Sequence, residues 1–581
     1  MRYLALACDY DGTLATDGQI DAKTIGALQR LVASGRKLLL VTGRELEDLV
    51  AVFPRVDLFH RVIAENGALL FDPSTREETI LASPPPREFI ETLRKRHVTP
   101  LSVGRVIVAT WQPHERTVLD AIRDLGLELQ VIFNKGAVMI LPSGMNKAIG
   151  LAAALAELKL SAHNVVGIGD AENDHAFLQL CECSAAVANA LPALMDHADI
   201  VTRAAHSAGV CELIDEMLKD DLRSVGSKLT RHHLLVGSRS NGEEVCIPPY
   251  GVNLLVAGSS GGGKSTLATG LLERFAERGY QFCVLDPEGD YEHVANAITL
   301  GDTQHAPSID EVLRVLDDPA SNLAVNLVGL PLEERPRFFG ALSSRLQELR
   351  ARTGRPHWIV LDETHHLLSV GFEPAEITLA QSFTSMVFIT VEPKSVARAV
   401  LESVDIVIAL GKNPVEVLDE FVQSVGERLP TPQSLDAKSG EGLLWARHAG
   451  EAPLRLCPEV SRSERSRHRR KYAEGELGPE RSFYFRGAKG QLNLRAQNLI
   501  LFSQVAEGVD DATWVYHLRN GDYSRWFQEV IKNEDLAAEA RRIEQSLELS
   551  PGQSRAHIKR AIEQHYTLPS SAGTSSSDSA V

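Results

Sequence analysis

The stretch that decides the fold of the first domain is Tyr3-Leu-Ala-Leu-Ala-Cys-Asp-Tyr-Asp-Gly-Thr13. Residues 4–8 have the length and composition of a buried strand, and the polar residues follow at its carboxyl end. Gly12 allows the backbone to turn sharply there. A helical pattern at residues 22–33 and a second apolar strand at 37–41 come next. This alternation predicts an α/β fold with a parallel sheet, in which ligands bind at the carboxyl ends of the strands.

Further polar clusters end a strand or open a helix of the same domain. They are Thr42-Gly43-Arg44, Lys147, and Gly169-Asp170-Ala171-Glu172-Asn173-Asp174. Parallel strands bring such ends together in space. A carboxylate can attack phosphorus, and a second acid two residues away can transfer protons. Carboxylate oxygens suit Mg²⁺, and a hydroxyl and an ammonium group would stabilise a transferring phosphoryl group. We therefore expect a phosphoryl-transfer site that uses Mg²⁺.

These motifs, with Glu65-Asn66-Gly67-Ala68, resemble the haloacid dehalogenase superfamily of phosphatases over about residues 1–217. The similarity is greatest to the subgroup that carries an α/β cap between the second and third motifs, which includes sugar-phosphate and phosphoglycolate phosphatases. The resemblance implies Asp9 as nucleophile and Asp11 as general acid/base. It implies that Thr42 and Lys147 bind phosphate and that the metal site comprises Asp9, the carbonyl of Asp11, Asp170, Asn173 and Asp174. The expected substrate is a small phosphorylated metabolite.

A second motif, Gly258-Ser-Ser-Gly-Gly-Gly-Lys264-Ser265, fits the pattern G-x4-G-K-[ST]. It lies between an apolar strand at 252–257 and a helix at 266–278, which favours a phosphate-binding loop over a glycine-rich linker. The backbone N–H groups of such a loop surround phosphates at the positive end of the helix. Lys264 would reach the β- and γ-phosphates of ATP and Ser265 would hold Mg²⁺. The remaining predicted nucleotide-binding residues are Gly258, Gly261, Gly262, Gly263 and Thr266.

The partner of this loop is a strand at 358–361 that ends in Asp362 and Glu363. Asp362 would bind Mg²⁺ through water, and Glu363 would polarise the attacking water. The stretches 284–290 and 236–245 resemble the HerA/FtsK superfamily of P-loop ATPases, over about residues 228–455. Its members commonly form hexameric rings and pump DNA or protein. Glu392 stands where such ATPases often carry a polar sensor, commonly Gln. The sequence offers Arg345, Arg352 and Arg355 as arginine fingers without choosing among them.

The net charge of the chain indicates which partners it can bind. The chain has 60 Lys and Arg against 77 Asp and Glu, a net charge of −17. Residues 251–460 hold 17 basic against 29 acidic residues, a net charge of −12. A channel that threads DNA needs basic residues, so this balance argues against DNA, although a local basic patch stays open. The function we predict is a phosphomonoester hydrolase with an ATP-binding, regulatory or driving domain. The alternatives are a DNA-translocating ATPase with an accessory phosphatase, or a nucleotide-gated signalling or defence protein.

The predicted organisation is multidomain. The expected parts are a phosphatase core (1–82 and 144–217), an inserted α/β cap (83–143), a linker with a short β region (218–250), a P-loop domain (251–460), a basic linker (461–480), a mainly helical module (481–566) and a disordered tail (567–581). No stretch reaches the roughly 18 apolar residues of a membrane helix. Seven scattered cysteines suggest a reducing cytoplasm. In the last module we expect helices at 492–506, 512–518 and 536–549, with the aromatics between Trp514 and Phe527 packed in its core.

Overall fold

The computed structural model describes the chain except residues 17, 135, 260–261, 293, 295, 372–383, 430–439, 460, 462–476, 478–480, 489, 491, 532, 547–548 and 567–581. The chain divides into two compact units, Met1–Glu459 and Val460–Val581. Nearly all of the predicted basic linker, the whole predicted tail and the predicted phosphate-loop residue Gly261 lie outside the described residues. In the part that is described, no helix is both long enough and apolar enough to cross a membrane.

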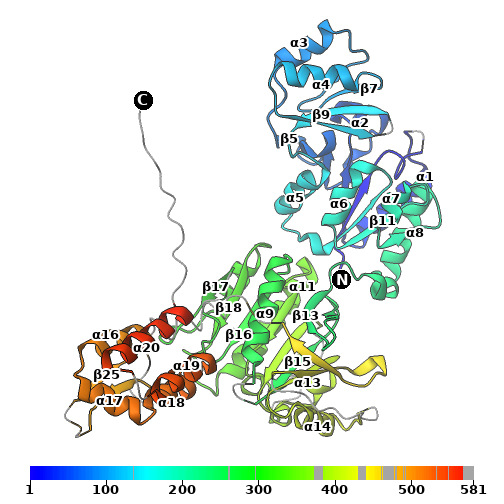
Figure 1. Cartoon of the computed structure of the whole chain (residues 1–581). Helices are drawn as coiled ribbons and strands as arrows, with labels where there is room; N and C mark the ends of the chain where they lie inside the picture. The colour runs from blue at the N-terminus through cyan, green and yellow to red at the C-terminus, as the bar shows by residue number, and fades with distance from the viewer. Residues whose placement is uncertain are drawn as a thin grey trace, which may run out of the picture. The chain divides into compact units, whose positions relative to one another are not determined.

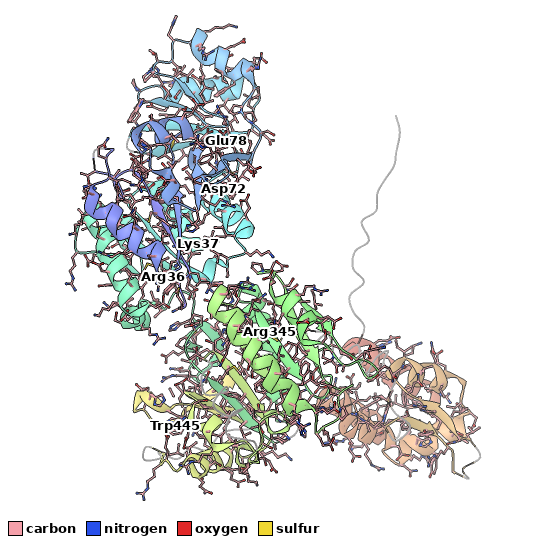
Figure 2. All side chains as sticks on the ribbon, turned by 180° about the vertical axis from the view of Figure 1, so that it is seen from behind. Arg36, Lys37, Asp72, Glu78, Arg345 and Trp445 are labelled. Atoms are coloured by element: carbon pink, nitrogen blue, oxygen red, sulfur yellow. The ribbon has the colours of Figure 1, made fainter. Side chains whose placement is uncertain are left out.

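An eight-stranded sheet forms the centre of the N-terminal domain, in the order β12-β11-β10-β1-β2-β3-β4-β5 (Figure 1). Its strands are β1 (Ala5–Asp9), β2 (Lys37–Val41), β3 (Arg61–Ala64), β4 (Leu69–Asp72), β5 (Glu77–Ile80), β10 (Val165–Gly169), β11 (Cys183–Ala186) and β12 (Ile200–Val201). Neighbours from β12 to β3 are parallel, and the hairpin β4–β5 adds two antiparallel strands, on which Figure 2 labels Asp72 and Glu78. The helices are α1 (Ala22–Ala33), α2 (Leu46–Val52), α5 (Lys147–Glu157), α6 (His175–Leu180), α7 (Pro192–Met195) and α8 (His206–Asp220).

The cap is inserted between β5 and α5. It has a four-stranded antiparallel sheet in the order β6-β7-β9-β8 and two helices that pack together on their own small apolar core. Its elements are β6 (Ser102–Val103), β7 (Val108–Trp111), β8 (Leu129–Asn134), β9 (Ala137–Pro142), α3 (Arg87–Lys95) and α4 (Glu115–Asp124). Figure 1 shows this lobe set off from the core helices α6, α7 and α8. A second apolar cluster, which includes Ala68, Val106 and Met139, joins the cap to the core.

The P-loop domain is built on an eleven-stranded sheet in the order β14-β13-β23-β22-β21-β15-β20-β19-β16-β18-β17. The parallel strands are β15 (Leu254–Gly258), β16 (Phe282–Asp286), β17 (Ala297–Leu300), β18 (Asn322–Asn326), β19 (Trp358–Leu361), β20 (Met386–Thr390) and β21 (Ile406–Leu410). An antiparallel extension contains β13 (Leu234–Ser238), β14 (Glu244–Ile247), β22 (Gly442–Ala446) and β23 (Leu454–Pro458). The helices are α9 (Lys264–Glu277), α10 (Ile309–Leu316), α11 (Arg335–Thr353), α13 (Arg398–Glu402) and α14 (Pro414–Val425). Alternate residues along the central strands enter two separate apolar cores, which explains why these strands are apolar throughout.

The last unit is a hairpin followed by helices. Its elements are β24 (Phe483–Phe485), β25 (Leu494–Ala496), α16 (Leu499–Gly508), α17 (Asp511–Arg519), α18 (Asp522–Glu529), α19 (Glu534–Gln545) and α20 (Pro551–Tyr566). The expected helix at 492–506 is wrong in its first part, because β25 pairs with β24 and Asn498 caps α16 by accepting from the Leu501 amide. Aromatic residues fill the core as predicted, including Trp514, Tyr523 and Phe527, whereas Tyr516 is exposed. The predicted fold class is confirmed: a parallel-sheet domain with a cap, a P-loop-type α/β domain and a mainly helical module.

Candidate functional site

The N-terminal domain gathers buried acids around one lysine at the carboxyl edge of its sheet. β1 ends at Asp9, and α5 begins at Lys147. The Lys147 ammonium donates to Oδ1 of Asp9 and to Oδ1 of Asp174, each at 2.6 Å, and all three side chains are almost fully buried. Gly67 lets α5 come this close, because a Cβ atom there would lie 2.0 Å from the Asn146 carbonyl oxygen. Lys147 therefore serves as a fixed cation for two acids.

Asp170 and Asp174 are held by short local contacts. The second carboxylate oxygen of Asp174 accepts from the amides of Asp170 and Ala171, both at 2.9 Å. The Thr13 hydroxyl donates to Asp170 at 3.2 Å. Gly169 makes room for this arrangement, since a Cβ atom there would lie 2.6 Å from the Asp174 carboxylate. The loop after β10 is thus folded around its own acid, and it directs Asp170 toward the end of β1.

The charge balance of this cluster fits a divalent cation. Asp9, Asp170 and Asp174 offer carboxylate oxygens within 4.8 Å of one another. Burial, and then the charge of Asp174, raise the pKa of Asp9 well above its usual value even though Lys147 opposes the shift. One ammonium group thus leaves the three buried carboxylates undercompensated. Mg²⁺, which prefers oxygen ligands, would supply the missing charge, so the residues fit the ion that the motifs imply.

Arg44 is a site residue to which sequence reasoning gave no role. Its guanidinium donates to both carboxylate oxygens of Asp11, each at 2.7 Å, and to Asp48 at 2.5 Å. The hydrogen bonds to Asp11 are the largest cause of a raised pKa for Arg44. Two parallel bonds fix the plane of a carboxylate as well as its charge. Its position in Thr42-Gly43-Arg44, directly beyond a strand end, was the available signal.

Other predicted residues surround this centre. The Thr42 side chain is completely buried, and its hydroxyl accepts from the Arg44 amide at 3.1 Å. Asn173 donates to the Asn66 side chain at 3.0 Å, which links the segment Glu65-Asn66-Gly67-Ala68 to the loop after β10. A Cβ atom on Gly43 would lie 3.5 Å from Met139 of the cap and 3.6 Å from Asn173. The structure thus brings together the N-terminal site residues that the sequence predicts.

Glu65 holds the cap against this edge, a role that the sequence did not reveal. Its buried carboxylate accepts backbone N–H groups from Arg105, Val106 and Ile107 at 2.7–2.8 Å. A Cβ atom on Gly104 would collide with the same carboxylate at 2.7 Å. Three donors from one short segment fix the position of the segment that joins β6 and β7.

In the P-loop domain, glycines shape the turn between β15 and α9. A Cβ atom on Gly258 would lie 2.2 Å from the Leu410 carbonyl oxygen, and one on Gly262 would lie 2.9 Å from that of Ser259. Gly263 has a positive φ of 92° immediately before α9, a conformation that favours glycine. Lys264 is buried, and its ammonium donates to the Ser259 carbonyl at 3.4 Å. The predicted residues Ser265 and Thr266 form the first turn of α9.

The acids of this domain lie at neighbouring strand ends. Leu285 on β16 pairs with Leu361 on β19, so that Asp286 and Asp362 follow in adjacent strands. Burial, followed by the charges of Glu363 and Asp286, raises the pKa of Asp362 to about 8. Burial also raises the pKa of Glu363, while the charge of Lys264 opposes that shift. The sequence prediction did not include Asp286, although it ends an apolar strand just as Asp362 does.

Asp286 organises a loop. Its carboxylate accepts from the amides of Glu288, Gly289 and Tyr291 at 2.8–3.2 Å.

Of the three candidate arginine fingers, Arg355 is excluded by its contacts. It is fully buried and donates to Gln281, Leu316 and Lys159. Glu392, at the sensor position, accepts from Ser395 at 3.1 Å.

The comparisons with known proteins identify a family for each of the two α/β domains. Residues 6–101 and 114–214 match the haloacid dehalogenase-like hydrolases, and the chain belongs to this family through its N-terminal part. Residues 252–354 match the central domain of the helicase HerA. Both predicted resemblances are thereby confirmed, and the first domain is a haloacid dehalogenase-type hydrolase.

Among curated relatives, a phosphoglycolate phosphatase of Methanothermobacter thermautotrophicus is 30% identical over 219 residues, which cover 36% of this chain and 96% of the relative. Phosphoglycolate phosphatase 2 of Saccharolobus solfataricus is 29% identical over 226 residues, covering 37% of this chain and 92% of the relative. A solved haloacid dehalogenase-like hydrolase from Bacteroides thetaiotaomicron is 18% identical, with a TM-score of 0.33, and covers 37% of this chain and 99% of its own.

Proposed function

We propose that the N-terminal domain hydrolyses a phosphomonoester through an aspartyl-phosphate formed on Asp9. The observation that carries this proposal is the buried pairing of Asp9 with Lys147 at 2.6 Å, at the end of β1. The ammonium group orients the Asp9 carboxylate and opposes the burial that raises its pKa. In the reaction, one Asp9 oxygen bonds to phosphorus as the alkoxide leaves, and water later cleaves the acyl phosphate to release inorganic phosphate and restore Asp9.

Asp11 would protonate the leaving oxygen and later take a proton from the attacking water. Arg44 holds the plane of the Asp11 carboxylate through two 2.7 Å bonds, so it acts as a positioning residue. The Thr42 hydroxyl and the Lys147 ammonium would bind phosphoryl oxygens, whose negative charge they stabilise.

Asp9, the Asp11 carbonyl and Asp170 would hold Mg²⁺, with Asn173 and Asp174 supporting the site. When bound, the ion neutralises charge on the phosphoryl oxygens. Both carboxylate oxygens of Asp174 already accept hydrogen bonds, one from Lys147 and the other from two backbone amides. We therefore assign Asp174 to positioning Lys147 and the loop after β10, next to the metal.

The proposed substrate is a small phosphorylated metabolite, and 2-phosphoglycolate is the first to test because curated relatives carry that activity in their names. The test is phosphate release from a panel of phosphomonoesters with Mg²⁺, by wild type and Asp9→Asn. We expect release by wild type only. Absence of release from every phosphomonoester in the panel, or equal release by the variant, would overturn the proposal.

We also propose that the P-loop domain binds and hydrolyses ATP. Gly258, Gly261, Gly262, Gly263 and Thr266 would surround the phosphates, with Lys264 reaching the β- and γ-phosphates. Ser265 and Asp362 would hold Mg²⁺, and Glu363 would polarise water. Support comes from the tight glycine turn before α9 and the neighbouring strand ends that carry the acids. ATP turnover that is lost in Lys264→Ala and Glu363→Gln would support this assignment, and turnover retained in both would contradict it.

The relation between the two activities is open to a direct test. If nucleotide regulates or drives the phosphatase, ATP should change phosphate release by wild type but not by Lys264→Ala. Ring assembly with ATP hydrolysis stimulated by DNA would favour the translocase alternative instead, against which the net charge of −12 over residues 251–460 argues. ATP binding without turnover would favour a nucleotide-gated signalling or defence role.

We propose the reducing cytoplasm as the location of this protein, because all seven of its cysteines are free.

A further inference from the structure

Glu182 is a buried carboxylate that belongs to neither proposed site. It lies directly before β11 and is 2% exposed. It accepts hydrogen bonds from Arg2, from Nδ1 of His163 at 2.6 Å and from the Tyr280 hydroxyl at 2.8 Å. Arg2 and His163 belong to the hydrolase domain, whereas Tyr280 belongs to the P-loop domain and directly precedes the segment that leads into β16. One buried charge is therefore satisfied from both domains.

His163 extends the same contact. Its Nε2 lies 2.6 Å from the carbonyl oxygen of Arg278, in the P-loop domain. Its ring is stacked on Tyr280, with centroids 3.7 Å apart and planes inclined by 19°. The two ring nitrogens thus face one acceptor in each domain. Buried polar groups of this kind hold two surfaces in one relative position, because any shift leaves them without partners in a dry environment.

Further contacts between the two domains lie around this network. Arg355 donates to the Lys159 carbonyl at 3.0 Å, and the Lys159 ammonium lies 2.5 Å from Asp317. A Cβ atom on Gly354 would lie 2.3 Å from the side-chain amide of Asn164, so the backbone approaches that side chain directly. The junction is closely packed around the Glu182 network.

A metal site is the competing explanation, since His163, Glu182 and His232 could be brought around an ion. The hydrogen bonds argue against it. Glu182 already accepts from three donors, and the guanidinium of Arg2 would repel a cation. Burial by itself would raise the pKa of Glu182, but the hydrogen bond from His163 and the charge of Arg2 together lower it to about 2. The carboxylate is therefore compensated without a metal.

The residues of the junction lie at the amino-terminal ends of strands in both domains. Arg2 and Asn164 precede β1 and β10, while Tyr280 and His357 precede β16 and β19. The same end of the first sheet is marked by Arg36 and Lys37 in Figure 2, away from Glu78 on the hairpin β4–β5. In both domains the strands that begin at the junction end at an acid or directly before one: β1 and β16 end at Asp9 and Asp286, and Asp170 and Asp362 directly follow β10 and β19.

We propose that Glu182, His163 and Tyr280 form an interdomain latch that fixes the hydrolase domain to the P-loop domain as one rigid body. The latch joins the amino-terminal edges of the two sheets, so that the two catalytic edges face away from each other. A reaction product then cannot pass directly from one site to the other. Any coupling between the sites has to be transmitted through the strands that connect the latch to each set of acids.

The test is a distance measurement between spin labels on the full chain. Gln29 on α1 and Asp310 on α10 are exposed and can be changed to cysteine, after the accessible Cys246 and Cys457 are replaced by serine. We expect one narrow distance distribution. The double variant His163→Ala/Tyr280→Phe should broaden it at least about twofold. A broad distribution with the intact latch, or an unchanged narrow one in the variant, would overturn the proposal.

The matched control is Tyr3→Phe/Tyr291→Phe. Both hydroxyls are buried and have no hydrogen-bond partner among the residues that the structure describes, so this pair should leave the distribution narrow. If the latch variant fails to fold, Tyr280→Phe alone is compared with Tyr291→Phe by amide hydrogen exchange. Exchange at residues 158–164 and 354–358 should rise about tenfold in the former only, and equal rates would contradict the latch. Dilution with unlabelled chain that abolishes the distance signal would show docking between chains and overturn the assignment within one chain.

Discussion

The buried acids of the two domains lie at equivalent strand ends but differ in what neutralises them. In the hydrolase domain, Lys147 bonds to both Asp9 and Asp174 at 2.6 Å. In the P-loop domain, Lys264 bonds to the Ser259 carbonyl, and no ion pair joins Asp362 to a lysine or arginine anywhere in the described chain. Burial, followed by the charges of Glu363 and Asp286, raises the pKa of Asp362 to about 8.

The difference indicates that the two sites reach charge balance in different ways before and during ligand binding. The hydrolase site carries part of its positive charge within the fold, so its acids are ordered before a ligand arrives. The P-loop site keeps its lysine available for phosphate and depends on the incoming Mg²⁺ and nucleotide for charge balance. Each prediction below tests one side of this contrast.

The largest effect should come from Asp9→Asn. An amide cannot form the acyl phosphate, so we expect phosphate release to fall by at least about 10⁴-fold. Nucleotide binding should be unchanged, because Asp9 lies in the other domain. A residual rate within tenfold of wild type, measured by phosphate release under saturating substrate, would remove Asp9 from the role of nucleophile.

Removing the two lysines should have unequal effects on stability. Lys147→Met leaves two buried carboxylates without their cation, and we expect a loss of about 3–5 kcal/mol. Lys264→Met is the matched control, because its ammonium donates to one carbonyl at 3.4 Å, and it should change stability by less than about 1 kcal/mol. Denaturant unfolding followed in each domain checks this pair. Equal losses would show that the contrast between the sites is wrong.

The same Lys264→Met variant should weaken nucleotide binding. Loss of a charged hydrogen-bond donor to phosphate is expected to lower affinity about 10- to 100-fold. Calorimetric titration with a non-hydrolysable ATP analogue and Mg²⁺ measures it. Unchanged affinity would mean that the loop before α9 does not bind phosphates.

The raised pKa of Asp362 predicts a pH dependence for the metal-free chain. Since its folded pKa of about 8 lies above the ordinary value of 3.8, the protonated form is favoured in the fold. Stability of the P-loop domain should therefore fall as pH rises from about 4 to about 8, with a contribution of up to about 1.4 kcal/mol per pH unit. Thermal unfolding in the presence of a chelator should show this slope, and Asp362→Asn should flatten it. The same slope in the variant would assign the titration to another group.

The smallest effect should come from Arg44→Ala, which removes the two bonds that orient Asp11. We expect kcat/KM to fall about tenfold, with the fold intact, because the acid is misplaced and not removed. Arg30→Ala is the control, since the Arg30 side chain forms an exposed ion pair with Asp215. Full activity in Arg44→Ala would show that the pairing with Asp11 has no catalytic consequence.

Much of the fold and of both sites could be predicted from local pattern. Apolar runs that end in Asp9, Asp170 or Asp362 mark strands whose polar ends carry chemistry, and this information lies within a few residues. The prediction that a helix begins at residue 492 was wrong, because pairing with another strand decides whether residues 494–496 form a strand or a helix. Residues 494–496 join β24 by hydrogen bonds that no local propensity encodes, and Asn498 then sets the start of α16.

The sequence by itself determined which residue types carry the chemistry and in which order their strands appear, because motif spacing and hydrophobic period are local properties. Only the tertiary structure decided that Lys147 bonds to Asp9 and Asp174, that Arg44 holds Asp11 and that Glu65 holds the cap. It also decided that Glu182 is shared between two domains. These contacts join residues far apart in the chain, and their partners are set by burial and by the satisfaction of polar groups in the folded state.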